Sequence, residues 1–183
     1  MQTVLSLLRG VNVGGRGLIR MQALRELYEA LGLIGVQTFI QSGNVLFRTE
    51  EADMNQLALR IAAAIEREFY MKPAILMRTL PEWREVVASN PFAAREDMEP
   101  AKLLVTFVAR TLTAPQRRAA EAISVGPEVL IARRREVYAY YPEGLGQSKL
   151  TPALLERTLS QPGTGRNWNS VLKMLALAEA LDE

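Results

Sequence analysis

The sequence predicts an α+β fold made of two copies of one unit, each with a largely antiparallel sheet packed against helices. Apolar residues recur at strand and helix spacings in the order strand, helix, strand, strand, helix, over residues 3–70 and again over 102–160. This order is the split β-α-β arrangement of ferredoxin-like folds. No residue-by-residue similarity accompanies it, so the order of the elements alone indicates the duplication.

The first copy begins with an apolar strand at 3–8 and a helix over 21–32, for which Gly32 is the stop signal. A hairpin follows, because Ser42-Gly43-Asn44 supplies turn residues between two apolar runs. Asp53 with Gln56 three positions later resembles a capping box at the start of the next helix. The remaining elements are expected as strands at 36–40, 45–47 and 73–77 and a short helix from Thr79-Leu80-Pro81-Glu82 that ends before Asn90-Pro91.

The second copy repeats these signals from Lys102 onward. Thr113-Ala114-Pro115-Gln116 predicts a capped helix that runs to about 123, and Thr151-Pro152 predicts one that runs to about 159. Pro162-Gly163-Thr164-Gly165 is expected to break the chain before a last amphipathic helix. The strands are expected at 103–108, 129–132 and 137–141, the last two as a hairpin around 133–136.

We therefore predict two domains, 1–92 and 101–183, the second with an extra C-terminal helix. The acidic, proline-containing stretch 93–100 is the expected linker between them.

The composition excludes several classes of protein. Lys plus Arg number 22 against 20 Asp plus Glu, so a basic function must come from local clustering rather than from net charge. The chain has no cysteine and no histidine, which excludes Ser-His-Asp and Cys-His hydrolases and the usual zinc sites. No apolar run is long enough to span a membrane, and the first residues lack a positively charged leader. We expect a cytoplasmic protein without a membrane partner.

The most distinctive segment is a glycine-rich basic loop behind the first strand. Two arginines and four glycines occur in Arg9-Gly10-Val11-Asn12-Val13-Gly14-Gly15-Arg16-Gly17. Glycine permits left-handed torsions and the close approach of a ligand, and successive backbone N–H groups can bind an anion. The loop departs from the P-loop, because Arg16-Gly17 replaces Lys-Ser/Thr, and it also lacks G-x-G-x-x-G. It could equally be a plain strand-to-helix connection.

Two further polar motifs join this loop in the hypothesis. Gln41-Ser42-Gly43-Asn44 is a hairpin turn that could also present a hydroxyl and an amide beside the first loop. Arg166-Asn167-Trp168-Asn169 is expected at a helix start, where unpaired N–H groups favour anions, with Thr164 or Asn167 as the cap. Alternatively, Arg166 only ties the last helix to the body of the protein.

Taken in order, these three motifs resemble the signature of the family called domain of unknown function 1697, over nearly the whole chain. The resemblance implies an α+β fold with a ferredoxin-like duplication. It implies no activity and defines no catalytic residues. The matched positions are Arg9, Gly10, Asn12, Gly14, Ser42, Gly43, Asn44, Arg166, Asn167 and Trp168.

The leading hypothesis is that the protein binds a small, phosphate-bearing anion. Catalytic residues, a cofactor and an oligomeric state are not identified, and no metal ligands are predicted. The expected ligand-binding residues are Arg9, Gly10, Asn12, Gly14, Gly15, Ser42, Gly43, Asn44, Arg166 and Asn167.

Nucleic acid is a second candidate partner. Arg133-Arg134-Arg135 is followed by Tyr138, Tyr140 and Tyr141, and arginines with stacking tyrosines could hold a single strand. Charges at a hairpin tip also prevent edge-to-edge aggregation, which is the simpler interpretation. The sequence is also compatible with an enzyme that works without histidine or cysteine, and with a protein-interaction scaffold.

Overall fold

The computed structural model describes residues 1–12 and 18–183. Two compact units make up the described chain, Met1–Glu85 with Met174–Glu183 and Val86–Lys173. The division falls within two helices, α3 (Leu80–Ala88) and α6 (Trp168–Asp182). These are units of packing, and the domain boundaries derived from the sequence stay a prediction.

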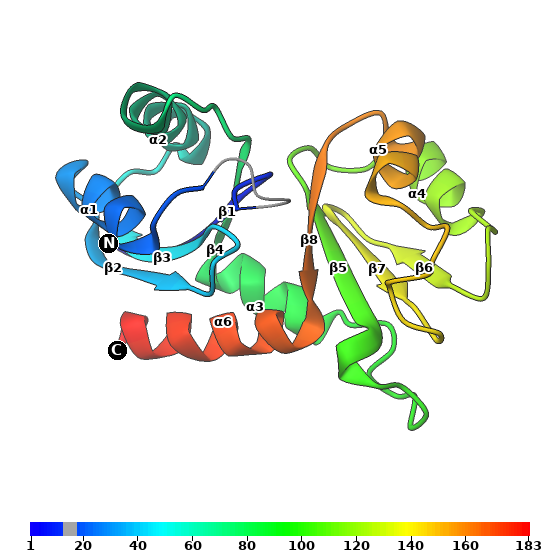
Figure 1. Cartoon of the computed structure of the whole chain (residues 1–183). Helices are drawn as coiled ribbons and strands as arrows, with labels where there is room; N and C mark the ends of the chain where they lie inside the picture. Colours follow the sequence, from blue (N-terminus) through cyan, green and yellow to red (C-terminus); the bar gives the residue numbers. More distant parts are fainter. Residues whose placement is uncertain (13–17) are drawn as a thin grey trace. The chain divides into compact units, whose positions relative to one another are not determined.

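The first unit contains a four-stranded antiparallel sheet with the order β2-β3-β1-β4 (Figure 1). Helices α1 and α2 connect its strands, and both lie on one face of the sheet (Figure 1). The elements are β1 (Gln2–Leu8), α1 (Met21–Ala30), β2 (Ile34–Phe39), β3 (Asn44–Thr49), α2 (Met54–Phe69) and β4 (Ile75–Thr79).

Local signals set the helix ends as the sequence predicts. The Asp53 side chain accepts hydrogen bonds from the Asn55 and Gln56 amides at 2.9 and 3.0 Å, which caps α2. The second bond of the predicted capping box is replaced, because the Asp53 amide donates to Glu51 Oε1 at 3.1 Å. Gly32 follows α1 with φ +82°, a left-handed torsion that suits glycine at a helix C-terminus. These capping groups act over three or four residues, so they can be recognised in the sequence.

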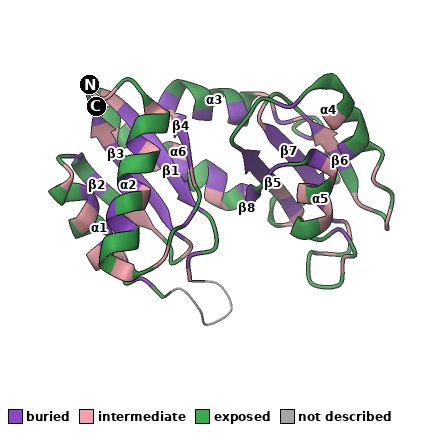
Figure 2. Cartoon of the chain, turned by 90° about the horizontal axis from the view of Figure 1, so that it is seen from above, coloured by how far each residue is buried: buried purple, intermediate pink, exposed green. Residues whose placement is uncertain are grey.

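The core of the first unit lies between the sheet and helices α1 and α2. Buried residues run along the strands, whereas the outer sides of these helices are exposed (Figure 2). Tyr28 from α1 packs edge-on against Phe47 from β3, with ring centroids 5.6 Å apart. The Tyr28 hydroxyl lies 2.8 Å from the Ser6 hydroxyl, and both residues are fully buried. The opposite face of the sheet contacts α6, because Thr3 donates to Asp182 at 2.7 Å.

The buried tyrosine predicts a loss of stability at high pH. Burial raises the pKa of Tyr28 above its ordinary value of about 10, and the hydrogen bond with Ser6 opposes this only in part. Above pH 10 the unfolded chain therefore loses this proton while the folded protein keeps it. The stabilisation is complete below about pH 10 and then falls by about 1.4 kcal/mol per pH unit until the folded protein also ionises. Burial also raises the pKa of Tyr141, to about 12, so Tyr141 adds to this loss of stability above pH 10.

Urea unfolding at a series of pH values from about 9 to 12 checks this prediction. Tyr28→Phe is expected to show a shallower decline of unfolding free energy with pH than the native protein. Tyr70→Phe is the matched control, because Tyr70 is 93% exposed and its removal should leave the slope unchanged. Equal slopes for Tyr28→Phe and the native protein would contradict the assignment.

The second unit repeats the same topology, with the strand order β6-β7-β5-β8 and antiparallel pairs throughout. Thr113 and Gln116 form a complete capping box at the start of α4, as the sequence predicts. The two-repeat α+β fold is thereby confirmed. The elements are β5 (Leu103–Val108), α4 (Ala114–Glu121), β6 (Val129–Ala132), β7 (Glu136–Tyr140), α5 (Pro152–Leu159) and β8 (Gly163–Asn167), with a short 3-10 turn η1 (Pro100–Lys102) before β5.

The sequence interpretation was wrong at β8, where it expected a chain break. Gly163–Asn167 is instead an edge strand that pairs with β5, in the register Thr106↔Gly165. A Cβ atom on Gly163 would lie 2.7 Å from Thr106 Cγ2 and 3.2 Å from the Phe107 carbonyl oxygen. The glycine is therefore required by the close approach of β5, which a local pattern of turn residues does not reveal.

Two absences hold for the described part of the chain. None of its helices has the length and apolar character needed to cross a membrane. Nor do three or more Asp and Glu side chains gather there in a way that could hold a metal ion.

Candidate functional site

The first two polar motifs meet at one end of the first sheet. The Leu8 amide at the end of β1 donates to the Gly43 carbonyl at 2.8 Å, and the Arg9 amide donates to the Ala74 carbonyl at 2.9 Å. The backbone at Leu8 and Arg9 is thereby held between the β2–β3 turn and the segment that leads into β4. Arg9 and Gly10 are exposed, whereas Val11 is buried.

The backbone at the start of this loop is left-handed at two positions. Gly10 has φ +76° and Asn12 has φ +57°, so two left-handed residues flank Val11. Among the described residues, no acceptor is hydrogen-bonded to the backbone N–H groups of Gly10, Val11 and Asn12. A Cβ atom on Gly10 would meet nothing within 4 Å, so the space beside it is open.

The Asn12 side chain joins described residues on both sides of residues 13–17. Its Oδ1 accepts from the Ile19 amide at 2.7 Å, and its Nδ2 donates to the Ile19 carbonyl at 3.0 Å and to the Gln41 carbonyl at 2.8 Å. One amide thus joins the beginning of the loop, its end before α1, and the β2–β3 turn. These bonds make Asn12 a positioning residue.

The β2–β3 turn is built around a second asparagine. Asn44 is fully buried, and its Nδ2 donates to the Phe39 carbonyl and to the Ser42 hydroxyl, both at 3.1 Å. Gly43 has φ +72°, and a Cβ there would lie 2.8 Å from Leu8 Cβ. Gly43 therefore permits the close contact between the turn and β1. Of the turn residues, Ser42 is half-buried and brings a hydroxyl to this end of the sheet.

Two predicted ligand-binding residues, Gly14 and Gly15, lie outside the described residues, as do Val13, Arg16 and Gly17.

The third motif lies in the second unit, on β8 and the first turn of α6. The Arg166 side chain is buried and donates through Nη1 to the Thr164 hydroxyl at 2.7 Å and to the Gly165 carbonyl at 2.9 Å. Burial lowers the pKa of Arg166 to about 10. Asn167 Oδ1 accepts from the Asn169 amide at 3.0 Å, so Asn167 caps α6, one of the two residues that the sequence offered for this role.

The tyrosines of the basic-aromatic segment lie in the core of the second unit. Tyr138, Tyr140 and Tyr141 are 0%, 5% and 6% exposed. The Tyr138 hydroxyl donates to the Val86 carbonyl at 2.6 Å, and its ring lies 6.5 Å from that of Trp168. These rings already have packing partners, so they do not form a surface on which bases could stack.

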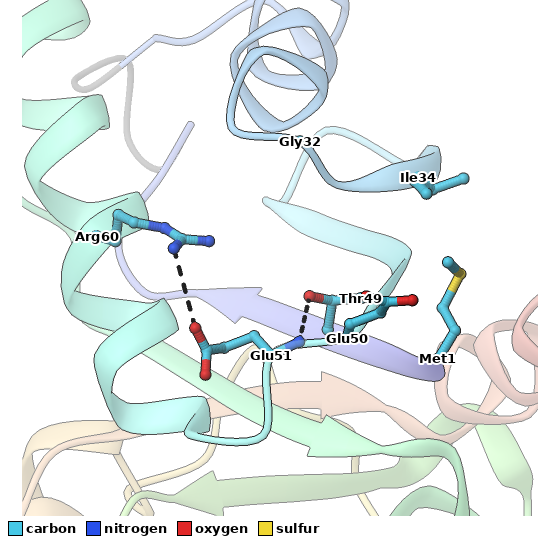
Figure 3. A pocket seen from close by; sticks show the side chains of 7 residues that line it. All are labelled: Met1, Gly32, Ile34, Thr49, Glu50, Glu51 and Arg60. Atoms are coloured by element: carbon cyan, nitrogen blue, oxygen red, sulfur yellow. Dashed lines mark hydrogen bonds and ion pairs between the residues drawn. The ribbon is translucent and has the colours of Figure 1, made fainter.

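A hollow that the sequence does not mark opens at the opposite end of the first sheet (Figure 3). Its volume is about 550 Å³, and Arg60 extends across it toward Glu51, with 3.9 Å between guanidinium and carboxylate (Figure 3). The Glu51 amide donates to the Thr49 hydroxyl at 3.1 Å. Because the lining comes from several distant segments, no local pattern reveals it. The lining residues are Met1, Gly32, Ile34, Thr49, Glu50, Glu51 and Arg60.

A second, smaller hollow of about 180 Å³ belongs to the second unit. Glu128 and Ser148 line it, and the Ser148 hydroxyl donates to the Glu128 carboxylate. The other Glu128 oxygen, Oε2, is buried without a hydrogen-bond partner among the described residues. Lys149 also lines this hollow, so its walls carry both signs of charge.

Comparison with known proteins gives a family and a fold. A family model described as "Protein of unknown function (DUF1697)" matches residues 1–138. No curated protein matches the chain. A solved structure, described as that of conserved bacterial protein SP0830 from Streptococcus pneumoniae, is similar with a TM-score of 0.75 and 22% sequence identity. The match covers 97% of this chain and 98% of that one, and at this identity it is informative about the fold.

Proposed function

The chain belongs to the DUF1697 family of proteins of unknown function, and we propose from its own structure that it binds a small phosphate-bearing anion. The binding site lies at the end of the first sheet formed by Arg9–Asn12 and the β2–β3 turn. The observation that carries this proposal is the run of three backbone N–H groups, at Gly10, Val11 and Asn12, that have no acceptor among the described residues. We place this activity in the cytoplasm.

The residues of this end have different roles in the proposal. The backbone donors of residues 10–12 bind the anion, and the exposed Arg9 side chain adds a charge-assisted contact. The Ser42 hydroxyl is a further polar group within the same end of the sheet. Asn12 and Asn44 position the two backbone segments, because their amide groups already bond to neighbouring carbonyls. The site so defined rests on the first unit and leaves out Arg166 and Asn167.

Isothermal titration with inorganic phosphate and pyrophosphate tests the proposal. Gly10→Ala should weaken binding by about tenfold or more, because alanine disfavours the left-handed torsion that aligns the donors. Gly32→Ala is the matched control, since Gly32 also has a positive φ and no atom within 4 Å of a Cβ. Both substitutions should lower the unfolding free energy by about 1 kcal/mol, but only the first should change affinity.

The Arg9 side chain gives an independent check. Arg9→Gln is expected to weaken phosphate binding by about tenfold, because it removes one charge-assisted hydrogen bond. Arg25→Gln removes the same charge from an exposed face of α1 and should leave binding unchanged. The proposal fails if neither anion binds, or if the control variants weaken binding as much as the site variants.

A further inference from the structure

Five arginines belong to segments that meet at one end of the second sheet. At this end β5 ends, β6 turns into β7 and α4 begins (Figure 1). We call Arg110, Arg117, Arg133, Arg134 and Arg135 together the arginine edge. The chain as a whole has nearly balanced charge, with 22 basic and 20 acidic residues. This grouping is therefore a local concentration and not a consequence of net charge.

Hydrogen bonds show that these arginines belong to one end of the unit. The Val108 amide donates to the Arg135 carbonyl at 3.0 Å, and the Leu112 amide donates to the Arg134 carbonyl at 2.6 Å. Arg117 Nη1 donates to the Leu112 carbonyl at 2.7 Å, which holds its guanidinium close to the same turn.

The buried Gln161 side chain fixes Arg110 at this end. Gln161 accepts from the Arg110 amide at 3.0 Å and donates to its carbonyl at 3.2 Å. The guanidinium of Arg110 donates to the Ser160 carbonyl at 3.2 Å. Side-chain and backbone bonds thus hold the loop after β5 in one place, beside the β6–β7 turn.

Four of the five arginines of the arginine edge are without an ion pair in the described part of the chain. Among the described residues, Arg110, Arg117, Arg133 and Arg134 form no ion pair with any carboxylate. Of these four, Arg117 is half-buried and the others are exposed.

Two carboxylates lie beside the turn, and both bond to backbone amides. Glu121 accepts from the Ala132 amide at 2.9 Å, and Glu136 accepts from the Arg135 amide at 3.3 Å. A third carboxylate, that of Glu156, accepts from the Gly163 amide at 3.1 Å beside the end of β5. Five guanidinium groups against three carboxylates still leave a net positive end to this unit.

We propose that the arginine edge binds the phosphate backbone of a nucleic-acid duplex. Guanidinium groups pair with phosphate oxygens in a bidentate manner, and several in one region suit a partner with repeated phosphates. The neighbouring tyrosines are buried, so recognition uses the backbone and not the stacking of unpaired bases.

Fluorescence anisotropy tests this inference. Labelled DNA and RNA duplexes of about 20 base pairs are titrated with the full chain at salt concentrations from about 50 to 200 mM. Binding should weaken steeply as salt rises, because each neutralised phosphate contributes about −0.9 to the slope of log affinity against log salt. The triple variant Arg110→Gln, Arg133→Gln, Arg134→Gln should reduce that slope by about three and lower the affinity by at least about tenfold.

A matched triple variant distinguishes duplex binding by the arginine edge from a general effect of the protein's positive charge. Arg25→Gln, Arg60→Gln and Arg67→Gln remove the same charge from exposed helix positions of the first unit and should leave the slope unchanged. If the three-site variant of the edge misfolds, Arg133→Gln with Arg134→Gln alters only the turn and should reduce the slope by about two. Absence of duplex binding at low salt, or equal weakening by both triples, would overturn the inference.

Discussion

Replacing Gly163 by valine is expected to lower the unfolding free energy of the second unit by about 3 kcal/mol or more. The first added carbon would lie 2.7 Å from the Thr106 methyl group and 3.2 Å from the Phe107 carbonyl oxygen. Neither atom is the far end of a long side chain, so β8 would have to move away from β5. That movement would break the pairs Phe107↔Thr164 and Val108↔Gly163 at this end of the sheet.

Gly146→Val is the matched control for this substitution. Gly146 belongs to the same unit, has no positive φ, and a Cβ atom there would meet nothing within 4 Å. Urea unfolding followed by circular dichroism should show a change within about 0.5 kcal/mol for Gly146→Val. Equal stability of the two variants would show that β8 is not as tightly packed as the structure describes.

Leu57→Ala is expected to destabilise the first unit by about 2 to 5 kcal/mol. Leu57 lies on the inner side of α2, is fully buried, and belongs to the core between the sheet and its two helices. Its truncation removes apolar contacts and leaves a cavity that the surrounding strands can fill only in part.

The same helix provides the control two residues further on. Leu59 is 63% exposed, so Leu59→Ala makes an identical chemical change on the solvent side of α2. We expect its effect on unfolding free energy to stay within about 0.5 kcal/mol, because little packing is lost and alanine favours the helix. A large loss of stability from Leu59→Ala, or none from Leu57→Ala, would contradict the assignment of Leu57 to the buried side of α2 and Leu59 to its exposed side.

Much of the fold could be predicted because its signals are local. Asp53, Thr113 and Thr151 each accept hydrogen bonds from amides within three residues, so each of these helix starts is marked in the sequence. Apolar periodicity likewise locates the strands and the helix faces. The buried side of α6 is harder to locate from residue type, since Leu172 is 40% exposed whereas Met174 is fully buried.

The candidate site could be predicted only in outline. Glycine and asparagine at 10–12 and 41–44 indicated two special turns, and the structure brings these turns together within the first unit. The sequence could not show which polar groups of these turns bond within the protein and which are left for a ligand. The Asn12 side chain donates to the carbonyls of Ile19 and Gln41, and the Asn44 side chain donates to the carbonyl of Phe39. The backbone N–H groups of residues 10–12, in contrast, have no hydrogen-bond acceptor among the described residues.

By itself, the sequence determined the class of the fold, the order of most elements and the helix caps. It also determined which chemistries the lack of histidine and cysteine excludes. Each of these depends on composition or on contacts within a few residues. Only the tertiary structure decided that Gly163–Asn167 is a strand, that Tyr138 and its neighbours are core residues, and that the arginines of the second unit share one end of its sheet. Those outcomes depend on pairing and close packing between segments far apart in the chain, which no local pattern encodes.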